Sequence, residues 1–181
     1  MKQSTKAARR TFVASAFAFA FLAGVDASAK ELITNGSFEN PPCTAGKASG
    51  CSPWVFKGNS AVNDDFYGGK LGATVGGLGP GAGSISQSVD LKEGNYTFSF
   101  WFEPHKIVSG TTPAIVKVAN RIVFATMLPS QEDTTKWQQY TVTVAISKKE
   151  AGKRRVQFIA DKAPNYAGPL FNIDDVSLTG P

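Results

Sequence analysis

The fold is decided by one stretch near the end of the chain, Phe171-Asn172-Ile173-Asp174-Asp175-Val176-Ser177-Leu178-Thr179. Side chains alternate between the two faces of a strand, so Phe171 and Ile173 share one face, whereas Val176 and Leu178 have the opposite parity. The phase changes at Asp174-Asp175, which is typical of a β-bulge. Because two adjacent carboxylates are costly to bury without a cation or several hydrogen-bond donors, this strand is also a candidate cation site.

A counterpart to this strand lies at the other end of the chain, in Ile33-Thr34-Asn35-Gly36-Ser37-Phe38-Glu39. We expect a first short strand over residues 31–38, with a turn at Asn35-Gly36. The working hypothesis is that the two ends lie side by side in one β-sandwich and share a bound cation.

Residues 1–29 have the pattern of a secretory signal peptide. A basic start is followed by an apolar run from Phe12 to Val25 and by the small-residue sequence Ala27-Ser28-Ala29. This run is too short and wrongly flanked for a stable membrane span. We therefore predict cleavage after Ala29, one domain over residues 30–181, no membrane span, and a secreted or periplasmic protein from a bacterium.

The charge balance argues against nucleic acid as a partner. Without residues 1–29, the chain keeps 15 basic and 13 acidic residues, a net charge of about +2. Nucleic-acid-binding domains usually have a far stronger basic character. The one basic cluster, Lys148-Lys149 with Lys153-Arg154-Arg155, is interpreted as a solvated turn between two strands.

Cys43 and Cys51 are the only cysteines. In an exported chain, two cysteines this close together favour a disulfide that staples a loop. With one histidine in the chain, the pair alone is a poor metal site.

From Ile85 onward, apolar and polar residues alternate with a period of two in several segments, and turn-forming residues lie between these segments. The alternation covers residues 85–91, 96–102, 116–124, 140–146, 156–160 and 171–178, with Asn120-Arg121 as a hairpin turn. No segment has helical periodicity, so the predicted fold is all-β: a single-domain sandwich of two antiparallel sheets. Gln87 is expected to be a buried hydrogen-bonding residue, and Trp54 and Trp137 are assigned to the core.

An ordered set of short motifs resembles a known family. The motifs are Asn35-Gly36-Ser37-Phe38-Glu39, Trp54, residues 83–89, residues 94–101 and Ile173-Asp174-Asp175-Val176-Ser177-Leu178. In this order they resemble the galactose-binding-domain-like jelly rolls, specifically carbohydrate-binding modules of the family 4/9 and 22 type, and they are also similar to DUF642 cell-wall proteins. The resemblance implies a two-sheet jelly roll of five plus four strands or a similar arrangement, and a structural calcium ion where the first and last strands meet.

Carried over to this sequence, the resemblance assigns the calcium ligands. Glu39 and Asp174 would supply carboxylate oxygens, with the Ser37 carbonyl and Asp175 adding further ones, since Ca²⁺ takes six to eight oxygens. The alternative is that these carboxylates are solvated or capped by backbone donors.

Sugar binding needs flat apolar surface against the sugar ring and polar groups around it. Trp101 lies opposite the Phe98/Phe100/Phe102 face and is the first candidate, with Tyr67 and Tyr166 at the rim of a cleft and His105 or Asn165 as polar partners. The alternative for Trp101 is packing under a loop.

No catalytic motif stands out, since GxSxG and HExxH are absent and the single His105 is flanked by Pro104 and Lys106. The sequence favours a non-catalytic carbohydrate-binding protein that recognises polysaccharide or cell-surface glycan. The alternative is a structural or adhesive cell-surface or matrix protein that binds a protein partner. An aromatic platform would favour the first function, and a broad exposed apolar patch would favour the second.

Overall fold

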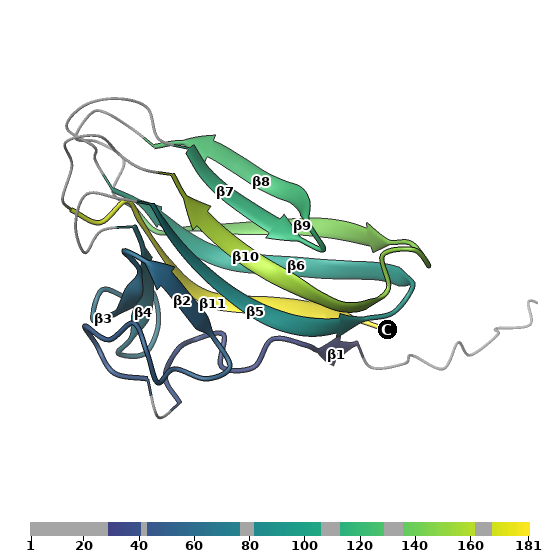
Figure 1. Cartoon of the computed structure of the whole chain (residues 1–181), viewed down its shortest axis with the longest axis horizontal. Coiled ribbons are helices and arrows are strands. Elements are labelled where there is room, and N and C mark those ends of the chain that lie inside the picture. Colours follow the sequence, from purple (N-terminus) through teal and green to yellow (C-terminus); the bar gives the residue numbers. More distant parts are fainter. Residues whose placement is uncertain (1–28, 41–42, 77–81, 106–112, 129–135, 162–167) are drawn as a thin grey trace, which may run out of the picture.

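Eleven strands form two antiparallel sheets that pack face to face in the computed structural model, which describes residues 29–40, 43–76, 82–105, 113–128, 136–161 and 168–181 (Figure 1). The strands are β1 (Lys30–Glu31), β2 (Val55–Gly58), β3 (Ala61–Asn63), β4 (Gly72–Val75), β5 (Gly83–Leu91), β6 (Gly94–Pro104), β7 (Pro113–Val118), β8 (Arg121–Met127), β9 (Gln138–Ile146), β10 (Gly152–Ala160) and β11 (Phe171–Gly180). Within these residues there is no helix, and hence none that could cross a membrane.

One sheet has six strands in the order β3-β4-β11-β6-β9, with β1 paired to β11, and the other has five in the order β2-β5-β10-β7-β8. The predicted single-domain jelly-roll sandwich is therefore confirmed, with six plus five strands in place of five plus four. The predicted signal peptide lies outside the described residues except for Ala29.

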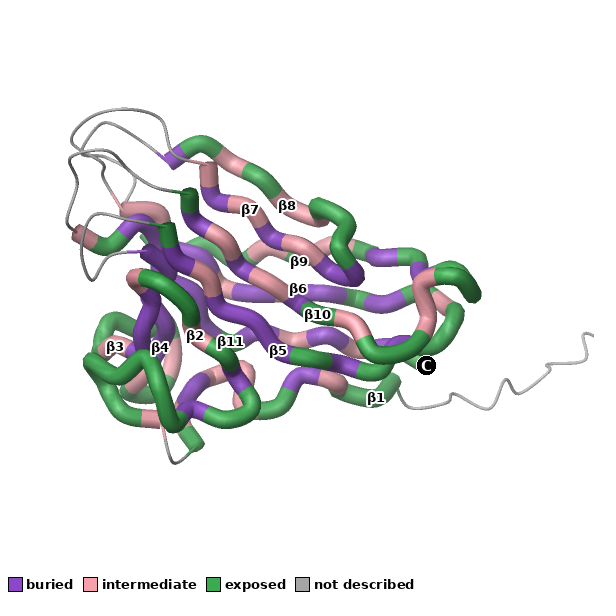
Figure 2. Tube along the Cα trace, viewed as in Figure 1, coloured by how far each residue is buried: buried purple, intermediate pink, exposed green. Residues whose placement is uncertain are grey.

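The core fills the space between the sheets, where the buried parts of the chain face one another (Figure 2). The inward face of β6 supplies Phe98, Phe100 and Phe102, each no more than 1% exposed, and Phe158 of β10 and Phe171 of β11 pack with them. The two-residue alternation of these strands thus produces the stacked layers, because each strand places every second side chain between the sheets.

The predicted bulge in the last strand is confirmed. Asp174 pairs with Trp101, but the next pair is Ser177 with Ser99, so the register shifts between them. Asp175 has a φ of 45°, which lets the backbone absorb the extra residue. The shift explains the phase change, because apolar residues on both sides of the bulge are buried between the sheets: Phe171, Ile173, Val176 and Leu178.

The two ends of the chain lie side by side, as expected. Lys30 and Glu31 of β1 pair with Gly180 and Thr179 of β11, and the Val176 N–H donates to the Gly36 carbonyl at 3.0 Å.

The predicted strand over residues 31–38 is mostly wrong, since β1 ends at Glu31. Asn35 and Phe38 adopt φ values of 54° and 58°, a left-handed conformation that breaks an extended strand. The segment instead forms a turn whose side chains reach into the core, where Phe38 is fully buried.

Other local predictions hold. Cys43 and Cys51 form the disulfide. Trp54 is 5% exposed, and its indole N–H donates to the Asn35 carbonyl. Gln87 is buried and exchanges two hydrogen bonds with the backbone of Thr34, so its amide is satisfied on an otherwise apolar face.

Candidate functional site

The outer face of the six-stranded sheet carries a pair of stacked aromatic rings. Trp101 faces away from the core, because it alternates with Phe100 and Phe102 on β6. Tyr67, in the loop before β4, stacks on it with ring centroids 3.4 Å apart and ring planes 14° apart, so Trp101 packs under this loop, as the alternative expected. Tyr67 is still 45% exposed, so part of this residue remains accessible to a ligand.

A third ring stands beside this pair. Trp137 lies 6.2 Å from Tyr67 between centroids, with the ring planes at 58°. Its assignment to the core was wrong, since the residue is only half-buried. Trp137 has the parity of outward-facing Gln139 on β9, a signal that the sequence contained. Tyr67, Trp101 and Trp137 are called the aromatic platform below.

Hydroxyl and amide groups continue the same face along the sheet. Gln139 is the cross-strand partner of Trp101, and two further pairs of small polar residues follow, Ser99 with Thr141 and Thr97 with Thr143. The platform therefore borders a polar surface that can donate and accept hydrogen bonds.

At the other side of the platform lies a polar cluster built around Asn172 of β11. The buried Asn172 amide donates to Asp65 Oδ2 at 2.7 Å and to Glu103 Oε2 at 3.2 Å. His105 Nε2 lies 3.8 Å from the same Asp65 oxygen and 3.7 Å from the same Glu103 oxygen. Burial, followed by the charge of Asp65, raises the pKa of Glu103, and burial lowers the pKa of His105. His105 thus belongs to this cluster, and Tyr166 and Asn165 lie outside the described residues.

Two of the predicted calcium ligands accept backbone N–H groups from one loop, which is the capping by backbone donors given above as the alternative. The backbone N–H groups of Tyr67 and Gly68 donate to Asp174 Oδ2, and those of Lys70 and Leu71 donate to Glu39 Oε1. A Cβ on Gly69 would come within 2.3 Å of Glu39 Oε1, so glycine permits this close approach.

Of the other two predicted ligands, Asp175 lies beside Gly68 of this loop. Ser37 is in the turn that follows Gly36, and Asp175 is exposed at the bulge. Oδ2 of Asp175 lies 3.3 Å from where a Cβ on Gly68 would stand.

Asp174 is the most deeply placed of these carboxylates, with no exposed surface. Burial raises its pKa to about 6, although three backbone N–H bonds oppose the rise. Because the folded protein holds the proton more tightly than the unfolded chain, stability falls as the pH rises from 3.8 to about 6, and the full cost of the ionised Asp174 remains at higher pH. A cation beside the carboxylate would offset this cost.

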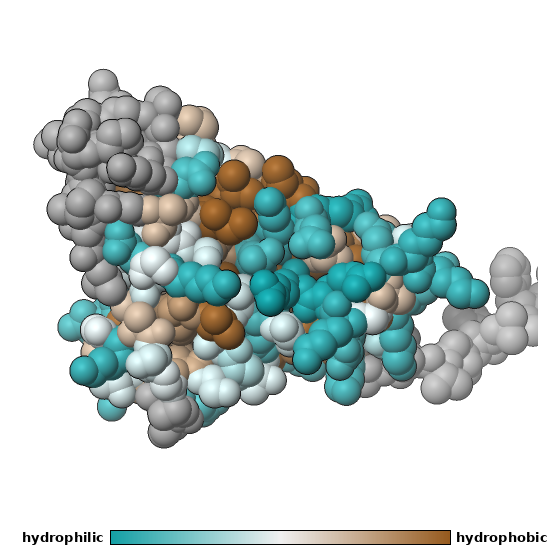
Figure 3. Space-filling model, in the orientation of Figure 1, coloured by the Kyte–Doolittle hydropathy of each residue, from teal (hydrophilic) through white to brown (hydrophobic). Residues whose placement is uncertain are grey.

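The outer face of the five-stranded sheet is different in character. A hollow of about 440 Å³ is lined by Ser88, Asn120, Lys153, Arg154, Arg155 and Gln157. Figure 3 shows this face, where hydrophilic residues gather over β5 and β10 and a hydrophobic patch lies over β7 and β8. The predicted turn at Lys148-Lys149 is confirmed, but Lys153, Arg154 and Arg155 belong to β10 and line this hollow.

A family model described as a carbohydrate binding domain matches residues 30–165. A search among curated proteins finds no match.

Solved structures share the fold. The module TmCBM61 in complex with β-1,4-galactotriose has a TM-score of 0.58 at 20% identity, covering 82% of this chain and 97% of its own. The Stig cyclase Fisc from Fischerella sp. TAU has a TM-score of 0.57 at 17% identity, and the match covers 84% of this chain and 98% of the cyclase chain. The CBM22-1 xylan-binding domain of Paenibacillus barcinonensis Xyn10C has a TM-score of 0.51 at 15% identity, and the match covers 83% of this chain and 94% of that domain. At these identities the likeness shows the jelly-roll architecture alone, which serves both binding modules and a cyclase.

Proposed function

The chain belongs to the carbohydrate-binding domain family 4/9, and we propose that it is an exported, non-catalytic protein that binds polysaccharide or cell-surface glycan through the aromatic platform. Membership of this family supports carbohydrate as the ligand. The signal-like residues 1–29 support export, and the absence of a catalytic motif from the sequence supports a binding role.

The observation that carries the proposal is the stack of Tyr67 on Trp101. Large aromatic rings are normally buried in the core, yet these two stand on an outer sheet face, with Tyr67 45% exposed. Stacking on Trp101 holds the Tyr67 ring in a fixed orientation, so little conformational entropy is lost when a sugar ring packs on its accessible part. Gln139 and the Asn172 cluster supply polar groups on either side for the sugar hydroxyls.

The test is binding of residues 30–181 to a polysaccharide and glycan array, followed by titration of the best ligand. Trp101→Ala removes the support of the stack, and truncating a central aromatic anchor typically costs about 2 kcal/mol or more. We therefore expect binding to weaken by about 30-fold or more, at 1.4 kcal/mol per factor of ten.

Arg155→Ala is the matched control, because Arg155 lies on the outer face of the other sheet. We expect it to leave the affinity within about twofold. If Arg155→Ala abolishes binding and a folded Trp101→Ala variant binds normally, the glycan site is the basic hollow, and the platform assignment is wrong.

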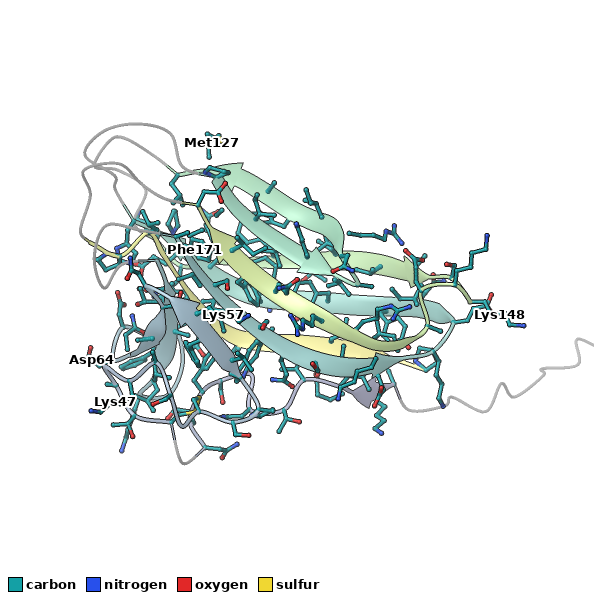
Figure 4. All side chains as sticks on the ribbon, in the orientation of Figure 1. Lys47, Lys57, Asp64, Met127, Lys148 and Phe171 are labelled. Atoms are coloured by element: carbon teal, nitrogen blue, oxygen red, sulfur yellow. A yellow bond between two sulfur atoms is a disulfide. The ribbon has the colours of Figure 1, made fainter. Side chains whose placement is uncertain are left out.

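The alternative function is structural or adhesive, with a protein partner. It is favoured by exposed apolar side chains on the five-stranded sheet: Ile122 is 61% exposed, Met127 54% and Val55 49%. Met127 stands at the end of β8, away from the sandwich interior (Figure 4). If the folded domain binds no glycan on the array, this second function replaces the first.

A structural calcium ion is the second part of the proposal. Among the described residues, the carboxylates of Glu39, Asp174 and Asp175 do not gather within 4.8 Å of one another, so a bound ion would have to draw them together. Glu39 and Asp174 carry carboxylates to the same loop from opposite ends of the chain, and buried Asp174 gains most from a neighbouring cation. The ion would be held by the Glu39, Asp174 and Asp175 carboxylates and the Ser37 carbonyl, and it would tie the first turn to the last strand.

Calcium is therefore expected to stabilise the domain. At a hundredfold excess over its dissociation constant, a ligand specific to the folded state adds about 2.7 kcal/mol. For a domain of this size that is a rise in Tm of about 5–10 °C, measured against a chelator. Glu39→Gln should remove most of the rise, whereas Asp64→Asn, an exposed carboxylate near the same loop, should keep it (Figure 4). An equal rise in both variants would contradict the assignment of Glu39.

A further inference from the structure

The cluster of Asp65, Glu103 and His105 shares no residue with the proposed calcium ligands. Each residue offers one ligand atom, and the three atoms lie within 4.8 Å of one another. Asp65 comes from the loop before β4, Glu103 from the outward face of β6, and His105 directly follows that strand. The three side chains are thus brought together by the sheet and by one loop.

The imidazole faces both carboxylates without bonding to either. His105 Nε2 is a buried atom with no hydrogen-bond partner, and it stands 3.7 Å from Glu103 Oε2 and 3.8 Å from Asp65 Oδ2. A buried polar atom left without a partner costs free energy, so such atoms point to a missing ligand or water. In the described part of the chain only one other side-chain atom is in this state, Asn63 Oδ1.

Asn63 is joined through its side-chain amide to the hydrogen-bond network around Asn172. Its amide nitrogen donates to Thr74 Oγ1 and to Asn172 Oδ1, and the Thr74 hydroxyl also donates to Asn172 Oδ1. These bonds fix the orientation of the Asn172 amide, so its nitrogen must face Asp65 and Glu103. Carboxylates held in this way by hydrogen bonds are typical of metal sites, where such bonds orient the ligands.

The cluster contains two carboxyl groups, and among the described residues His105 is the only basic side chain paired with them. Among the described residues, neither Asp65 nor Glu103 forms an ion pair with a lysine or arginine. The Glu103 side chain is only 11% exposed and that of His105 19%, whereas Asp65 is 50% exposed and leaves the cluster open to solvent on its side. A cation can therefore enter from the Asp65 side and reach the buried pair.

We propose that Asp65 Oδ2, Glu103 Oε2 and His105 Nε2 bind one divalent transition-metal ion of the zinc or manganese class. Ligands about 2.1 Å from a tetrahedral ion are about 3.4 Å apart, so the observed spacings of 3.7 and 3.8 Å need only a small contraction. One nitrogen and two carboxylate oxygens suit zinc, whereas calcium takes oxygen ligands alone. Three protein ligands leave at least one position for water or another oxygen.

The experiment is calorimetric titration of residues 30–181 with Zn²⁺ alone, after treatment with chelator. Co²⁺ serves as a second probe, because its visible absorption reports nitrogen and oxygen coordination. We expect one Zn²⁺ per chain. His105→Gln and Asp65→Asn should each weaken Zn²⁺ binding by at least about tenfold, and His105→Gln should change the Co²⁺ spectrum.

One control separates this site from its surroundings. Asp64→Asn removes a neighbouring exposed carboxylate outside the cluster, so it should leave Zn²⁺ affinity unchanged. Asp65 is half exposed, so Asp65→Asn tests the site without risk to the core. The proposal is overturned if the wild-type domain takes up no Zn²⁺, or if the His105 and Asp65 variants bind it as tightly as the wild type.

Discussion

Replacing Phe100 with alanine is expected to destabilise the domain by about 3–5 kcal/mol, the usual cost of deleting a fully buried phenylalanine ring. Phe100 has no exposed surface, and its ring contacts those of Phe98, Phe124, Tyr140 and Phe158. These rings come from both sheets, so the neighbours cannot close the cavity without moving the sheets together. Urea unfolding followed by tryptophan fluorescence measures the change.

Thr143→Ala is the matched control, because Thr143 is an exposed residue of β9, the strand that pairs with β6. Its cost should stay below about 1 kcal/mol. If Phe100→Ala costs no more than Thr143→Ala, the two sheets do not pack through this ring layer in solution.

Replacing Gly36 with alanine is expected to cost about 3 kcal/mol or more, because the new methyl group has no room. Its Cβ would come within 1.9 Å of the Val176 carbonyl oxygen, which is backbone and cannot rotate away. The Val176 N–H also donates to the Gly36 carbonyl, so relief of the clash would break the bond between the chain ends. The change in stability is measured by thermal and urea unfolding.

Gly46→Ala separates steric clash from backbone strain. Gly46 has a φ of 73°, but no atom lies within 4 Å of the position that a Cβ would occupy, so alanine there should cost only about 1 kcal/mol. Equal costs at the two positions would mean that close contact with β11 does not constrain Gly36.

Much of the fold followed from local patterns. Alternation identified which side of β6 is buried, and the phase change at Asp174-Asp175 indicated the bulge that the register confirms. The disulfide followed from the short spacing of two cysteines in a chain that we predict to be exported. The predicted turn at Asn35-Gly36 is present. The strand at residues 31–38 failed because Phe38 has a φ of 58°, which its residue type does not indicate, since bulky residues rarely adopt positive φ.

The sequence by itself determined the face on which each residue of a strand lies, because that depends only on the two-residue period of the backbone. It therefore placed Trp101 outside the core. Only the tertiary structure decided what lies beside Trp101. Tyr67 stacks on it from a distant loop. Asn172 bonds to Asp65, 107 residues away in the sequence, and to Glu103, 69 residues away. Such neighbours are set by strand order, register and loop path, which are global results of packing two sheets together.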